Sequence, residues 1–81
     1  MQLKIPISVI SSFDSATNRV GPRKFFWRGV DYTVSQIGLH HTIRRGQTLF
    51  HIFSVTANQT FFRLSLNTDN LFWELQEVSN D

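Results

Sequence analysis

Hydrophobic and polar residues alternate along most of this 81-residue chain. Between Leu3 and Val9, for example, every second residue is apolar. A period of two is typical of a half-buried β-strand, because successive side chains of a strand point to opposite faces. No segment carries the i, i+3, i+4, i+7 pattern of an amphipathic helix for more than a turn or two. The alternation therefore predicts strands at residues 3–9, 23–28, 30–34, 49–56, 60–66 and 71–78.

The breaks between these segments have the composition of turns. Gly29, Gly46 and the polar segments 57–59 and 67–70 each separate two alternating runs, which predicts short turns there. Residues 11–22 are polar without a sustained period and are interpreted as a loop, with turn chemistry at Asn18 and at Gly21 with Pro22. The alternation shifts by one residue after Val34, which indicates a β-bulge or strand bend.

Short connections between five or six strands favour an antiparallel meander. Curling such a sheet into a barrel removes its edges and encloses a core. The predicted fold is therefore all-β, a single domain over residues 1–81 with the size of an SH3-like or OB-like barrel. Pro6 cannot donate a ladder hydrogen bond, so its strand should lie at an edge there or should point that amide position outward. The predicted core consists of Ile5, Ile7, Phe25, Trp27, Tyr32, Val34, Phe53, Val55, Phe62, Leu64, Trp73 and Leu75.

Composition narrows the class of protein. The chain is 41% hydrophobic and 17% charged, which is too apolar for a disordered segment. No apolar run approaches the roughly 18–20 residues of a membrane helix, and the first residues lack the apolar core of a secretory signal. Cysteine is absent, which excludes disulfides and thiolate chemistry. We expect a cytoplasmic protein that does not associate with a membrane.

Charge is distributed unevenly along the chain. The net charge is +2, but residues 1–45 hold seven Lys and Arg against two Asp, a balance of +5. Residues 46–81 hold one Arg against four Asp and Glu, a balance of −3. Two interpretations remain open. The two parts can pair their charges across neighbouring strands, which we favour for so small a domain, or the first part can form a basic contact surface.

One motif resembles a known family. Residues 25–34 match the pattern F-x-W-R-G-x-x-Y-x-V, downstream of a short strand at residues 5–9, and Trp73, Leu75 and Val78 form a similar closing strand. Together these segments resemble a family of small bacterial β domains of unknown function. Some members accompany genes of DNA repair or translesion polymerases. The resemblance therefore implies a link to DNA transactions and no particular activity.

Catalytic and metal-binding patterns are weak in this sequence. Adjacent His40 and His41 point to opposite faces of a strand, so at most one of them can join His51, and a zinc site needs three or four ligands. No two carboxylates are placed together for acid–base catalysis. No serine lies in a Gly-x-Ser-x-Gly element, and glycine is too sparse for a phosphate-binding loop. We expect neither an enzyme nor a bound metal or cofactor.

The strongest binding signal lies at residues 24–28. If Phe25 and Trp27 face the core, Phe26 faces outward between Lys24 and Arg28. An exposed aromatic ring between cations can stack a base and neutralise its phosphates. Arg44 and Arg45 could add further phosphate contacts. The sequence thus predicts a small binding module for single-stranded nucleic acid of weak affinity.

Protein–protein contact is the alternative function. Eleven aromatic residues are many for one small core, and Phe50, Ile52 and Phe72 fall on the outer faces of their strands. A surplus apolar face often marks an interface. These three residues are the candidate contact site for a protein partner or for a homodimer.

Overall fold

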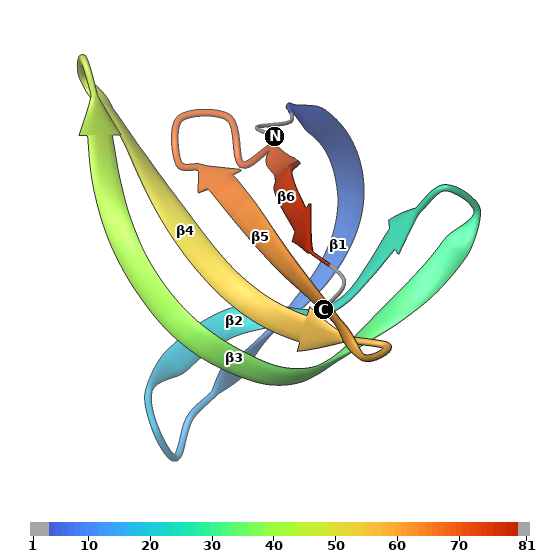
Figure 1. The fold of residues 1–81 in the computed structure, drawn as a ribbon. Coiled ribbons are helices and arrows are strands. Elements are labelled where there is room, and N and C mark those ends of the chain that lie inside the picture. The colour runs from blue at the N-terminus through green and yellow to red at the C-terminus, as the bar shows by residue number, and fades with distance from the viewer. Residues whose placement is uncertain (1–3, 80–81) are drawn as a thin grey trace.

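The computed structural model describes residues 4–79, without the side chain of Asp14, and consists of six antiparallel strands (Figure 1). Each strand pairs with the next and β6 pairs with β1, which closes a barrel. No described residue is helical, and hence no helix in that range could span a membrane. The all-β antiparallel barrel is confirmed. The strands are β1 (Ile5–Asp14), β2 (Arg19–Trp27), β3 (Val30–Arg45), β4 (Thr48–Ala57), β5 (Thr60–Asn67) and β6 (Trp73–Ser79).

Two tight turns join β2 to β3 and β4 to β5. Arg28 and Gly29 have φ values of 56° and 75°, and Asn58 and Gln59 have φ values of 52° and 64°. Two successive positive φ angles are typical of the type I′ turn, whose twist matches that of the flanking strands. The turns expected at Gly29 and at residues 57–59 are therefore confirmed, and their geometry fixes the register of both hairpins.

The core is formed by the inward faces of all six strands. All twelve predicted core residues either belong to the buried cluster or pack against it. At its centre the ring of Phe25 stacks on Tyr32 at a centroid distance of 5.1 Å. Phe62 meets both rings edge to face, each at 4.9 Å. Three aromatic rings therefore pack against one another at the centre of the core.

The first hairpin extends well beyond the barrel. The expectation of a loop at residues 11–22 is wrong, because Ser11–Asp14 pairs with Arg19–Pro22 as part of the β1–β2 ladder. This part of the hairpin is exposed on both faces except at Gly21 and Pro22, so it lacks the alternation that marks a half-buried strand. Asn18 does lie in the turn, with φ 58°, whereas Gly21 and Pro22 lie inside β2.

Beyond the barrel, β2 and β3 separate. Their ladder covers only Lys24–Trp27 against Val30–Thr33, after which β3 pairs with β4 alone as far as Arg45. The register shifts between Val34 and Gln36 and again between Ile37 and Leu39, which confirms the bend expected after Val34. Figure 1 shows the β1–β2 tip and the β3–β4 tip projecting apart. We call residues 11–23 the first arm and residues 36–51 the second arm.

The barrel closes through a short ladder between β1 and β6. Only Ile5–Ile7 pair with Trp73–Leu75, and Pro6 lies opposite Glu74. The β1–β2 ladder begins at Ser8, so Pro6 has a neighbouring strand on one side only, as expected for a residue that cannot donate. Leu71, expected at the start of β6, instead lies in the preceding loop with φ 62°. Leu3, the start of the first predicted strand, lies outside the described residues.

Candidate binding surface

The outer face of β2 carries the residue that the sequence singled out. Phe25 and Trp27 pack in or against the core, which leaves Phe26 pointing outward with 50% of its surface exposed. Lys24 lies two residues away on the same face, and its Nζ is 3.8 Å from the Oδ2 of Asp31. Both partners of this ion pair are exposed, so it is weak and leaves the ammonium group accessible.

Arg28 completes this surface from the β2–β3 turn. Its guanidinium lies 5.0 Å from the centroid of the Trp27 ring, within the range of a cation–π contact. Beside it a shallow hollow of about 480 Å³ is lined by Phe26, Trp27 and Arg28 and by residues 5–8 of β1. The structure therefore brings Phe26 and Arg28 together at one hollow, and Lys24 lies two residues from Phe26 on the same strand, outside the lining of the hollow.

Arg44 and Arg45 lie elsewhere. They occupy the last two positions of β3, whereas Arg28 lies in the turn before the other end of that strand. The guanidinium of Arg45 lies over the ring of Phe50 at 5.9 Å, on the outer face of the second arm. The five predicted cation and aromatic positions are thus split between the two ends of β3. The cations that do continue along β2 from Lys24 are Arg23 and Arg19.

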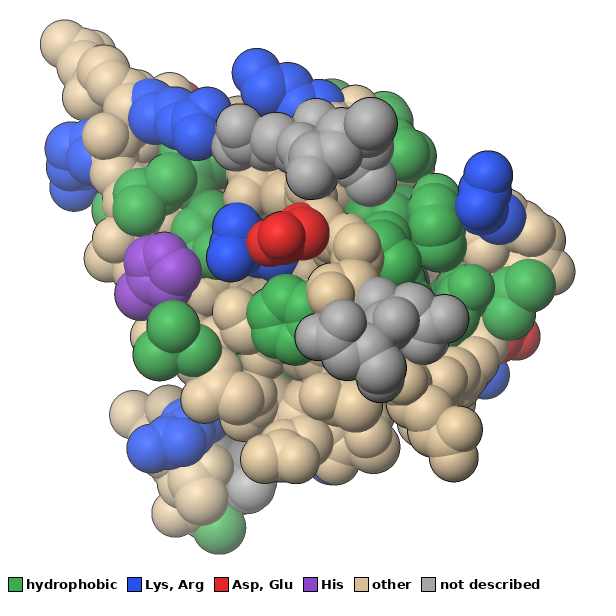
Figure 2. Space-filling model, in the orientation of Figure 1, with side chains coloured by type: hydrophobic (Ala, Val, Ile, Leu, Met, Phe, Trp, Pro, Cys, Tyr) green, Lys and Arg blue, Asp and Glu red, His purple; other side chains and the backbone are tan. Residues whose placement is uncertain are grey.

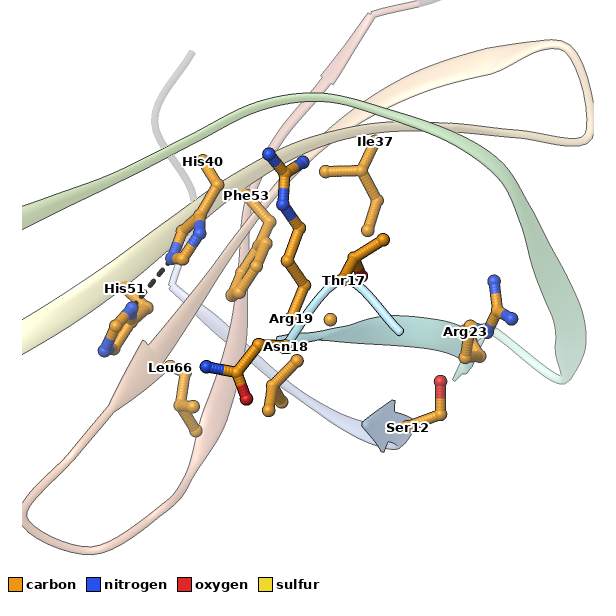
Figure 3. A pocket seen from close by; sticks show the side chains of 12 residues that line it. Ser12, Thr17, Asn18, Arg19, Arg23, Ile37, His40, His51, Phe53 and Leu66 are labelled. Carbon is orange, nitrogen blue, oxygen red and sulfur yellow. Dashed lines mark hydrogen bonds between the residues drawn. The ribbon is translucent and has the colours of Figure 1, made fainter. Parts of the chain in front are cut away.

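A larger groove separates the two arms (Figure 3). It measures about 850 Å³ and is lined by residues of β1, β2, β3, β4 and β5. At its base the arms meet, because a Cβ built on Gly21 would lie 2.7 Å from Cδ1 of Ile37, closer than two such carbons can approach. Glycine is therefore what lets β2 pass this close to β3. The arms spread apart from that point.

Two histidines form a pair in this groove. Nε2 of His40 and Nδ1 of His51 share a hydrogen bond of 2.8 Å. The His40 ring also stacks on Phe53, with centroids 4.2 Å apart and an interplanar angle of 10°. Partial burial, and then the nearby charges of His51, His41 and Arg19, hold the pKa of His40 below its ordinary value. His41 faces the other side of the strand, as the alternation predicted.

The charged side chains that line the groove are all basic. Arg19 and Arg23 come from β2, the histidine pair comes from the second arm, and no described carboxylate is among the lining residues. The apolar part of the wall is Val20, Ile37, Phe53 and Leu66. Arg23 reaches the groove because it is the extra residue of a β-bulge, between the pairs Ile10–Lys24 and Ser11–Pro22. Such a wall suits an anionic ligand with an apolar body.

The expected pairing of charges between the two parts of the chain is not observed among the described side chains. Lys24 pairs with Asp31 inside the first part, and Nη1 of Arg63 lies 2.9 Å from Oε1 of Glu77 inside the second. Lys and Arg are also not gathered into one patch. On the face shown in Figure 2 they lie apart from one another, with hydrophobic side chains between them. The basic surface is therefore the β2 strand and the groove, and it does not extend over a whole face.

The structure exposes other residues than those predicted for the alternative contact site. Ile52 is only 2% exposed and Phe50 is half-buried, so the expected interface of Phe50, Ile52 and Phe72 is not an exposed surface as a whole. Phe72 is 68% exposed and Leu71, beside it in the β5–β6 loop, is 69% exposed. The exposed apolar area at this point is therefore a Leu71–Phe72 pair.

The groove was not predicted from the sequence. Its existence depends on residues 11–22 being a hairpin and on β3 leaving β2, and neither follows from local alternation. The sequence held one indication of the groove. His51 and Phe53 are two residues apart in a strand and so share a face, which places His51 on the inward side. Among the described residues no group of three or more potential ligands could hold a metal ion.

These features define a class, a small closed antiparallel barrel with one basic strand and an open groove between two hairpin arms. Searches of protein-family models, of curated proteins and of solved structures find no match to this chain. The resemblance of residues 25–34 to a family of bacterial β domains therefore stays a prediction.

Proposed function

We propose that this domain is a binding module that holds single-stranded nucleic acid with weak affinity along the outer face of β2. The observation that carries the proposal is Phe26, which is half exposed on β2 between Lys24 of the same strand and Arg28 of the β2–β3 turn. An apolar ring of this size is normally buried unless it has a surface partner. A base can stack on it without sequence preference, because every base has an aromatic face.

The hollow beside Phe26 supports the same function. Its walls are the apolar rim of β1 and the Trp27 ring, with the Arg28 guanidinium at the edge. A base on Phe26 would therefore have an apolar recess beside it and a cation within reach of its phosphate. A duplex hides its bases inside the helix, so a site of this kind favours a single strand.

Further cations follow the same strand. Arg19 and Arg23 lie on β2 beyond Lys24, so four cations are spread from Arg19 to Arg28. Nine residues of extended chain span about 30 Å, which accommodates several nucleotides. Each phosphate contact should add to the salt dependence, by about 0.7 in the slope of log K against log salt. Arg44 and Arg45 are too far along β3 to belong to this set.

The test is fluorescence anisotropy with a labelled oligothymidylate of about 12 nucleotides and a duplex of equal length, at low salt. We expect binding in the micromolar range, stronger for the single strand. Phe26→Ala should weaken it by about 1–3 kcal/mol, or roughly 5- to 150-fold, with little change in the salt slope. Arg23→Gln should instead lower the slope.

Phe72→Ala is the matched control, since it removes another exposed phenyl ring away from β2. It should leave the affinity unchanged. Absence of binding at tens of micromolar protein, or equal loss in both variants, would refute the proposal. The net charge of +2 is too small to give nonspecific affinity of its own.

Protein–protein contact is the second candidate function. It is favoured by the exposed side chains of Leu71 and Phe72, which are adjacent in the sequence. Two exposed apolar side chains on one loop can serve as the centre of a small interface. Sedimentation at high salt tests it, because salt leaves an apolar dimer intact and screens electrostatic association. A dimer lost in Phe72→Ser supports this function, and a monomer at high protein concentration excludes the homodimer.

A further inference from the structure

The groove between the arms contains a histidine pair that the single-strand proposal does not use. Arg19 of β2, His40 of β3 and His51 of β4 line the groove around the stacked Phe53 ring. Figure 3 shows the Arg19 side chain extending past Phe53, with its guanidinium beside His40. Arg23 and Ser12 lie at the opposite end of the same groove. Three nitrogen-bearing side chains from three strands therefore converge at one end.

We propose that this end of the groove binds an oxyanion of the phosphate type, carried by a partly apolar molecule, and that binding takes up one proton at the histidine pair. A guanidinium presents a planar set of donors that matches the oxygens of phosphate. Two imidazoles beside it can supply further donors once one of them is protonated. This inference does not rest on the proposed function of β2.

The size and walls of the groove indicate an organic ligand. A volume of about 850 Å³ is within the range of sites for drug-sized molecules and far exceeds that of an oxyanion alone. Ile37 and Leu66 line the same space and are apolar. A nucleotide or another phosphorylated molecule would place its anion at Arg19 and its body against these side chains.

Proton uptake follows from the hydrogen bond between the histidines. For His40 and His51 to share this bond, one of the two facing nitrogens must accept it and so must carry no proton. The neighbouring charges are Arg19 from β2, His41 from β3 and His51 from β4, all cationic or able to become so, and they oppose protonation of His40. The strand β5 contributes only the apolar Leu66 to the described lining of the groove, so it adds no charge beside the histidines.

An anion in the groove would reverse this balance. Its negative charge stabilises the imidazolium, so a proton from solvent is added to a free imidazole nitrogen of the pair and no bond of the ligand changes. Asp14 is the register partner of Arg19 on β1 and lies in the outer part of the first arm. The linkage predicts tighter binding at lower pH, with at most a tenfold gain per pH unit for one proton.

The test uses calorimetric titration with sulfate, with a thymidine dinucleotide joined by one phosphodiester, and with thymidine as the uncharged control. Neither sulfate nor a phosphodiester titrates between about pH 5 and 8, so any pH dependence comes from the protein. We expect the dinucleotide to bind about three- to tenfold more tightly at pH 5.5 than at pH 7.5. Repeating the titration in buffers of different ionisation enthalpy should show uptake of up to one proton.

Variants separate the roles of the residues. Replacing both histidines, His40→Gln with His51→Gln, should abolish the pH dependence, and His51→Gln alone should reduce it. Arg19→Gln should weaken binding at both pH values. His41→Gln is the matched control, because His41 adjoins His40 in sequence but lies outside the groove; it should keep the proton uptake. If a variant fails to fold, imidazole NMR resonances of the unmodified protein give the same answer, since saturating dinucleotide should raise the pKa of His40.

Each outcome is decisive. Binding of both sulfate and dinucleotide with proton uptake supports a site for which a free oxyanion suffices, and binding of the dinucleotide alone supports an organic phosphate. The inference is overturned if thymidine binds as well as the dinucleotide, if no probe binds, or if binding is independent of pH. It is equally overturned if His41→Gln and His51→Gln behave alike.

Discussion

The closed part of the barrel, formed by residues 52–57 of β4 with β5 and β6, differs from the two arms in almost every physical respect. In β4 and β5 most residues are buried or half-buried, and each strand has a neighbour on both sides. In the first arm and along β3 beyond Val34, nearly all residues are exposed and each strand pairs on one side only. The first region holds the barrel together, and the second presents backbone edges and cationic side chains to solvent.

This division explains where a ligand could act. Side chains of the β4–β6 region are held by packing on both sides, so that region is poorly suited to adapting to a ligand. The arms bury little apolar area, so a change in their conformation should cost little stability. This property is usual for segments that bind ligands. The groove lies where the two regions meet, with Phe53 from the buried region and Arg19, His40 and His51 from the arms.

The largest expected effect comes from emptying the centre of the core. Phe62 has no exposed surface, and Phe62→Ala should lower the free energy of unfolding by about 3–5 kcal/mol. Phe26→Ala makes the same truncation on the outer face and should cost less than about 1 kcal/mol. Urea denaturation of both proteins measures the difference. Similar losses in the two variants would mean that the burial contrast does not govern stability.

A smaller effect is expected at the contact between the arms. Gly21→Val places side-chain atoms where Ile37 lies and should cost about 1–3 kcal/mol, the usual range for overpacking. Ile37→Ala in the same protein should recover part of that loss. Gly38→Ala is the control, because its Cβ would lie 3.7 Å from the nearest atom, an ordinary contact. Thermal unfolding of these proteins and of the Ile37→Ala single variant, five in all, checks the coupling, and strictly additive losses would contradict it.

The smallest effect is electrostatic. Unfolded His40 regains the ordinary pKa of 6.5, whereas the pKa of the folded residue is lower, so the unfolded state binds more protons between the two values. The free energy of unfolding should therefore fall as the pH is lowered through this interval and level off below it. His40→Gln should flatten this dependence and His41→Gln should not. A stability that rises toward lower pH in this range would contradict the direction of the shift.

The sequence predicted the buried region well and the arms poorly. Alternation located Phe62, Leu64, Trp73 and Leu75 on inward faces because one face of each of those strands is buried. The same logic could not find a strand at residues 11–14, where both faces are exposed. Phe26 was placed correctly because its neighbours Phe25 and Trp27 face the core, which leaves Phe26 on the outer face.

Long-range geometry was the other limit. Whether Arg44 and Arg45 lie near Lys24 depends on where β3 leaves β2, and the bulges that decide this depend on pairing with β4. The alternation predicted that Phe50 and Ile52 point away from the core, but Ile52 is among the buried core residues and Phe50 is half-buried. Alternation carries no information on which side chains are covered by neighbours. The histidine pair likewise required the register of His40 and His51 across the β3–β4 ladder.

The most direct test of the division between core and binding strand is residue-resolved NMR of the ¹⁵N-labelled protein during titration with a single-stranded oligothymidylate at low salt. We expect the amide shifts to concentrate on residues 19–28, together with the indole N–H of Trp27 and the groove residues His40, His51 and Phe53, while amides of β6 and of the rest of β4 and β5 hardly move. Shifts centred on Leu71 and Phe72, or spread evenly over β4, β5 and β6, would contradict it.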